Sequence, residues 1–188
     1  MFRLATAVLV VGMIGGLLHS LQRDQALPYL RLAYYPAIEK LVEAGEYREA
    51  LDQLRIAIDL DFLSRVRIHE EIAAIALKDN AVDDHIRACE DLMDLQVADP
   101  MIRVNLTGSL LRRGQPADIR KAETLSRRLL EDFPGQPEVN CNLGAALLAQ
   151  GKVDEAEFYF RRALEVNPVL GPAQQGLMII QQERGSDE

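Results

Sequence analysis

Apolar residues recur at intervals of three and four along most of the chain, from about residue 34 onward. This is the period of an amphipathic α-helix. Alternation of β-branched and polar residues, which predicts strands, nowhere lasts long enough to form one. We therefore expect an all-α domain over residues 31–184, with residues 185–188 as a short tail.

The first 21 residues have a different pattern. Residues 4–18 contain no charged or hydrogen-bonding side chain except that of Thr6. Extended over residues 2–21, the apolar run reaches the ~20 residues that a membrane-spanning helix needs. We predict a single-pass transmembrane signal anchor over residues 1–21 and a linker over residues 22–30. A cleavable signal peptide is the main alternative, but no small-x-small cleavage site follows the apolar run.

Two further features of this segment concern its packing and its orientation. Gly12, Gly15 and Gly16 form a strip that would let another transmembrane helix approach closely, or they are small residues without a specific role. The flanking Lys and Arg residues are balanced, so the signal-like N-terminus decides the orientation. We expect location in a bacterial inner (cytoplasmic) membrane, with the soluble domain in the periplasm.

The chain contains an internal repeat. The pattern Asn105-Leu106-x-x-x-Leu110-Leu111-x-x-Gly114 returns 37 residues later, from Asn142 to Gly151. Further along, matching residues are only 34 apart, and we assign the three-residue difference to a longer loop over residues 115–119. Residues 41–57 repeat the spacing once more. Each copy predicts two helices joined by a turn that contains glycine.

These residues resemble the tetratricopeptide repeat, a 34-residue helix pair. The best copy places eight residues on signature positions of that family: Leu143, Gly144, Leu147, Gly151, Ala156, Phe160, Ala163 and Pro168. Asn140 stands where the family favours Trp. The resemblance implies a helix-pair solenoid with repeats over about residues 31–62, 63–99, 100–134 and 137–170, and a capping helix over 172–183. The second repeat lacks a turn glycine at Asp79-Asn80.

Composition narrows the function. The chain of 188 residues has a formal charge of −8, which argues against a nucleic-acid binder. No phosphate loop, nucleophile elbow or metal-binding motif occurs. We expect no enzyme activity, no cofactor, no metal and no small-molecule substrate. Seven acidic residues lie in 79–99 and seven basic ones in 100–130. These stretches either attract one another or leave a basic patch for an acidic partner or lipid.

The resemblance also implies a function in binding other proteins, through a concave groove lined by the first helix of each pair. Carrying the family's groove positions over to this chain gives Tyr35, Glu39, Val42, Met101, Val104, Leu111, Arg112, Cys141, Ala145 and Leu148. Exposed apolar residues at these positions would bind an apolar helix or an extended segment of a partner. Alternatively, the chain's own linker or capping helix covers them.

We therefore expect a membrane-tethered scaffold that serves as an assembly factor or accessory factor of a membrane complex. The partner's contact could include a transmembrane helix of a complex subunit. The alternative is a permanent structural subunit of a membrane enzyme complex, held mainly by its transmembrane helix.

Overall fold

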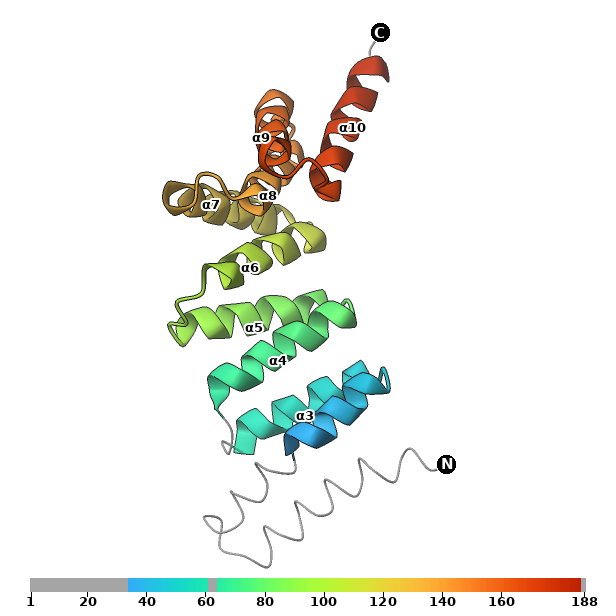
Figure 1. Cartoon of the computed structure of the whole chain (residues 1–188), viewed down its shortest axis with the longest axis vertical. Coiled ribbons are helices and arrows are strands. Elements are labelled where there is room, and N and C mark those ends of the chain that lie inside the picture. The colour runs from blue at the N-terminus through green and yellow to red at the C-terminus, as the bar shows by residue number, and fades with distance from the viewer. Residues whose placement is uncertain (1–33, 61–63, 187–188) are drawn as a thin grey trace, which may run out of the picture. The chain divides into compact units, whose positions relative to one another are not determined.

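The computed structural model describes residues 34–60 and 64–186, and these residues form helices and turns without a strand. Residues 34–43 are helical, and eight further helices follow (Figure 1): α3 (Tyr47–Leu60), α4 (Arg65–Lys78), α5 (Val82–Asp94), α6 (Pro100–Arg113), α7 (Pro116–Asp132), α8 (Pro137–Leu148), α9 (Val153–Val166) and α10 (Gly171–Ser186). The chain divides into two compact units, with the boundary between Asp84 and His85.

The expected membrane anchor over residues 1–21, with Gly12, Gly15 and Gly16, lies outside the described residues, as does the linker. Of the helices that are described, none has the length and apolar character needed to cross a membrane. The anchor therefore stays a prediction from the sequence.

In the first unit, α3 contacts α4 and is bound to the helix over residues 34–43. Tyr34 is buried and donates a hydrogen bond from its hydroxyl to the backbone carbonyl of Gln53. The buried face of α3 uses small and branched apolar residues at helical spacing, namely Ala50, Leu51, Leu54 and Ala57. The apolar side of this amphipathic helix thus forms part of the core of the unit.

The turns inside the helix pairs share one backbone conformation. Gly45, Gly114 and Gly151 have φ values of 75°, 71° and 75°, in the left-handed region that ends many helices. Asn80 takes the same position in the second pair, with φ 55°. Asparagine is one of the few residues that adopts this conformation readily. The missing glycine therefore does not disturb the second helix pair, in which α4 and α5 both form.

The prediction of a longer loop over residues 115–119 is wrong. Helix α6 ends at Arg113 and α7 already begins at Pro116, so only two residues connect them. The three extra residues instead lengthen α7, which has 17 residues where α9 has 14. Proline suits the first position of a helix because its missing N–H would have no partner there. Asp118 adds a favourable negative charge to the first turn.

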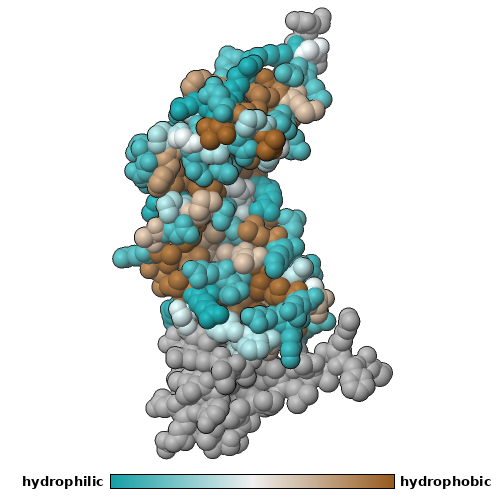
Figure 2. All heavy atoms as spheres, in the orientation of Figure 1, coloured by the Kyte–Doolittle hydropathy of each residue, from teal (hydrophilic) through white to brown (hydrophobic). Residues whose placement is uncertain are grey.

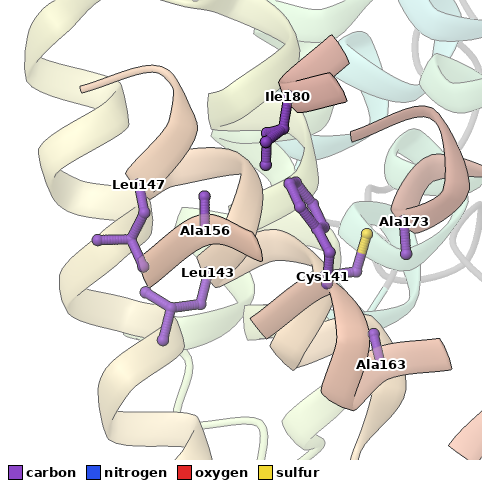
Figure 3. Packing of buried hydrophobic residues seen from close by; sticks show 8 residues of the cluster. Cys141, Leu143, Leu147, Ala156, Ala163, Ala173 and Ile180 are labelled. Atoms are coloured by element: carbon purple, nitrogen blue, oxygen red, sulfur yellow. The ribbon is translucent and has the colours of Figure 1, made fainter. Parts of the chain in front are cut away.

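The second unit has two layers of helices. Helix α8 contacts α6 on one side and α10 on the other, while α7 and α9 pack against this row. The largest cluster of buried residues joins α8, α9 and α10 (Figure 3) and contains Cys141, Leu143, Leu147, Ala156, Phe160, Ala163, Ala173 and Ile180. Ala156 and Ala163, two of the signature residues, have no exposed surface.

Phe160 fills the centre of this cluster because two glycines leave room for its ring. A Cβ atom added at Gly144 of α8 would lie 2.9 Å from the ring, and one at Gly176 of α10 would lie 2.4 Å from it. Both distances are far below van der Waals contact. Helices α8 and α10 therefore approach α9 only because both residues lack a side chain.

Gly176→Ala should destabilise the protein by about 1–3 kcal/mol, because the new methyl group collides with the Phe160 ring. Gly185→Ala is the matched control: it lies in the same helix, and a Cβ there meets nothing within 4 Å. Thermal unfolding measures both. The close packing of α10 would be refuted if Gly176→Ala melted no lower than the control.

Candidate protein-binding surface

In the first unit, the groove residue Tyr35 contacts a charged side chain of the next helix pair. Its half-buried ring lies 3.9 Å from the guanidinium carbon of Arg67, which comes from α4. The pKa of Tyr35 is raised above its ordinary value, mainly by burial. The charge of Arg67 opposes this shift, and the charges of Glu71 and Glu70 add to it. The hydroxyl oxygen is buried and has no hydrogen-bond partner among the described residues. The sequence analysis missed Arg67, because nothing in the repeat pattern marks that position.

The other groove residues of the first unit keep part of their surface accessible. Glu39 is exposed and Val42 is half-buried on the helix over residues 34–43. Together with Tyr35 they form a mixed strip of one aromatic, one apolar and one acidic side chain. Such a strip can contact a protein segment, but it offers no group with an unusual reactivity.

In the second unit, α6 presents three of the expected residues. Met101 is 42% exposed, Leu111 is half-buried and Arg112 is exposed. The expectation that Val104 is exposed is wrong: it is 6% exposed and packs with Leu129 and Val139. Its side chain serves the contact of α6 with α7 and α8, so it is not available to a partner.

Helix α8 presents fewer groove residues than expected. The expectation that Cys141 is exposed is also wrong, because its side chain is 5% exposed and belongs to the cluster around Phe160. Ala145 and Leu148 are half-buried and pack against that same cluster, to which α10 contributes Leu177. Part of this surface is therefore used for packing inside the second unit. We call the residues that keep exposed surface, Met101, Leu111, Arg112, Ala145 and Leu148, the α6–α8 face.

Asn142 joins the two helices of this face. Its side-chain amide donates a hydrogen bond of 3.2 Å to the backbone carbonyl of Val104. This asparagine therefore has a structural role in the contact of α8 with α6. Asn105, at the equivalent position one repeat earlier, is exposed.

Arg112 takes part in a polar network with the buried residues Ser109 and His85. Its guanidinium donates to the hydroxyl oxygen of Ser109 at 3.0 Å, and that hydroxyl lies 2.8 Å from Nδ1 of His85. Because the hydroxyl already accepts from Arg112, its own hydrogen can point to Nδ1, which places the imidazole proton on Nε2. Burial, and then the charge of Arg112, lowers the pKa of His85 below its ordinary value of 6.5. Nothing in the repeat pattern indicated this contact.

One ion pair joins the acidic stretch to the basic stretch. Lys121 of α7 and Glu90 of α5 form an ion pair with an N–O distance of 2.6 Å. Arg113 also pairs with Asp118 at 2.7 Å, and this hydrogen bond lowers the pKa of the carboxyl group. The Lys121–Glu90 contact supports attraction between neighbouring helix pairs, whereas Arg113 and Asp118 join the two helices of one pair.

The two cysteines of the described chain are buried, which lowers their reactivity. Cys89 and Cys141 are free and buried, and burial raises the pKa of each thiol to about 11. Both are therefore protonated at neutral pH, whereas a nucleophilic cysteine needs its thiolate. No group of three or more His, Cys, Asp or Glu residues suited to a metal occurs within 34–60 and 64–186.

Comparison with known families identifies the helix pairs. Tetratricopeptide repeat models match residues 35–94 and 137–168. The chain carries tetratricopeptide repeats. The first match covers the two helix pairs up to α5, and the second covers the pair of α8 and α9. No curated protein sequence matches the chain.

Several solved structures share the fold. "MamA MSR-1 C2" is 23% identical, covers 82% of this chain and 87% of its own, and has a TM-score of 0.60. "YrrB: a TPR protein with an unusual peptide-binding site" is 19% identical, with coverages of 92% and 88% and a TM-score of 0.66. The first TPR domain of the human RPAP3 protein is 22% identical, with coverages of 64% and 93% and a TM-score of 0.54. These likenesses show an all-α tetratricopeptide-like solenoid, as the sequence predicted.

Mild acid should destabilise the second unit through His85. Its folded-state pKa lies below 6.5, so the unfolded chain binds the proton first as the pH falls. The free energy of unfolding should be highest above pH 6.5 and should decline below it, before the carboxyl groups titrate. Denaturant titrations at several pH values measure the slope. His85→Gln should flatten the slope between about pH 6.5 and 5, and an unchanged slope would contradict this assignment.

Proposed function

We propose that the protein is a membrane-tethered scaffold that binds a segment of another protein on the α6–α8 face. The observation that carries this proposal is the exposure of Met101 at 42% at the start of α6, together with half-buried Leu111 near the other end of the same helix. Large apolar side chains that stay accessible on one helix favour a partner that buries them. The similar fold of YrrB, a TPR protein with an unusual peptide-binding site, supports the same use of the helix pairs.

The chemistry of the face favours an apolar helix or an extended apolar segment as the ligand. Met101, Leu111 and Leu148 supply flexible or branched apolar surface, and methionine adapts well to irregular partners. Arg112 follows Leu111 in α6, and its guanidinium donates one hydrogen bond to Ser109. A guanidinium has several N–H donors in a fixed fork, so it can also orient a carbonyl or carboxylate oxygen of the ligand.

Tethering to the membrane rests on the sequence of residues 1–21. An apolar run of this length after a single basic residue favours a signal anchor. A tether would hold the repeats close to membrane-embedded partners, so that even modest affinity gives binding. We accordingly assign the protein to the assembly or accessory factors of a membrane complex.

Met101→Glu should weaken partner capture at least tenfold while leaving the fold intact, because it places a charge in the apolar contact. A photo-crosslinking amino acid at exposed Ala149, the residue that follows α8, reports capture in native membranes, and mass spectrometry identifies the attached protein. Phe133→Glu is the matched control, with 40% exposure at the end of α7, outside the α6–α8 face. Equal loss in both variants, or crosslinks unaffected by Met101→Glu, would refute this binding surface.

The orientation across the membrane is a separate prediction. We expect a reporter that is active only in the cytoplasm to be silent when fused after Glu188, because the soluble domain should lie in the periplasm. A reporter active only in the periplasm should give signal at the same site. Reversed activities would place the repeats in the cytoplasm.

A further inference from the structure

The outward face of α10 differs from the rest of the surface. Ala173, Gly176 and Ile180 of this helix are buried against α8 and α9. At 100° per residue, the side that faces away from them carries Gln174, Gln175, Met178 and Gln182, with Ile179 at its edge. Met178 is 57% exposed and Ile179 is 45% exposed. On the face drawn in Figure 2, hydrophobic side chains reach the surface over the part of the second unit that holds α8, α9 and α10.

The charges of α10 lie away from this outward face. The helix has only two, Glu183 and Arg184, both near its C-terminal end. Arg184 points back to α9, where it pairs with Asp154 and with Glu157, both at 2.7 Å. The outward face therefore presents about three turns of helix without a charge, in a chain of which 27% of the residues are charged.

An outer face of this kind is unusual for a helix that ends a repeat stack. Terminal repeats normally turn a polar face to water, which keeps the stack soluble and stops further stacking. Glutamines meet that requirement in α10, but two large apolar side chains with about half of their surface exposed do not. Their exposure calls for an occupant.

We propose that a second copy of this chain packs on the outward face of α10, with the two helices antiparallel about a two-fold axis. With a formal charge of −8, two copies repel one another over most of their surface, and the uncharged face lacks that repulsion. The glutamine amides favour a copy of themselves because each has both donors and an acceptor.

The two-fold arrangement also fixes the register. In an antiparallel pair centred between Met178 and Ile179, Gln175 of one copy lies opposite Gln182 of the other, and the apolar residues meet at the axis. A helix of 16 residues is about 24 Å long, so the buried area is small. The dimer is accordingly weak and depends on concentration.

Sedimentation equilibrium of the full-length chain in density-matched detergent tests the proposal. We expect a monomer–dimer equilibrium whose dissociation constant rises at least tenfold in the double variant Met178→Glu, Ile179→Glu. Phe158→Glu is the matched control, since Phe158 is 55% exposed but lies on α9, and it should behave as wild type. A monomeric wild type overturns the proposal. So does a dimer that the double variant leaves unchanged, which would place the contact elsewhere, as in the apolar N-terminal segment.

A crosslinking experiment keeps the proposal testable if the double variant unfolds. Gln175→Cys and Gln182→Cys chains are purified separately, mixed and oxidised; the native Cys89 and Cys141 are buried and should not interfere. The antiparallel register predicts a disulfide between the two different variants, in clear excess over disulfides between identical ones. Thr124→Cys, at an exposed position on α7, is the control that should stay monomeric. Absence of the mixed disulfide, or equal yields in all mixtures, refutes the arrangement.

Discussion

The contact of the Phe160 ring with Gly144 and Gly176 determines how α8, α9 and α10 pack together. A single pair of amphipathic helices cannot bury its apolar face alone, so each element of a repeat stack depends on its neighbour. Here one aromatic side chain of α9 reaches both α8 and α10, and the two glycines remove the atoms that would hold those helices apart. The end of the stack therefore relies on one side chain, and the position of α10 depends on it directly.

The arrangement of helix pairs could be predicted because it repeats, whereas local departures could not. The glycine turns and the close alanines follow from spacing alone. The prediction of a longer loop over residues 115–119 was wrong because the number of residues between two matching positions does not say whether a loop or a helix is longer. Asn140 shows a compensation that spacing cannot reveal: it is buried, and its amide donates to the carbonyls of Pro134 and Gln136. It thereby fixes the turn before α8 in place of a large aromatic residue.

The binding face was predictable only in part, for a reason of geometry. Periodicity gives the angle of a residue around its own helix, but exposure also depends on the neighbouring helices. Met101 and Val104 lie on the same side of α6, yet only Met101 is exposed, because Val104 packs with Leu129 and Val139. The network of His85, Ser109 and Arg112 was invisible for the same reason, since it joins two helices through side chains that no repeat position requires.

The α6–α8 face and the capping helix pack against the same cluster of buried residues. Leu177 of α10 packs against the same cluster that Ala145 and Leu148 of the α6–α8 face contact. Whatever holds α10 in place therefore also holds the floor of that face, and a ligand on the face in turn favours the docked helix. By linkage, occupation of the outward side of α10 and binding on the α6–α8 face should each strengthen the other. The two surfaces use different residues, so one copy can use both at once, and the sign of their coupling follows from the shared cluster.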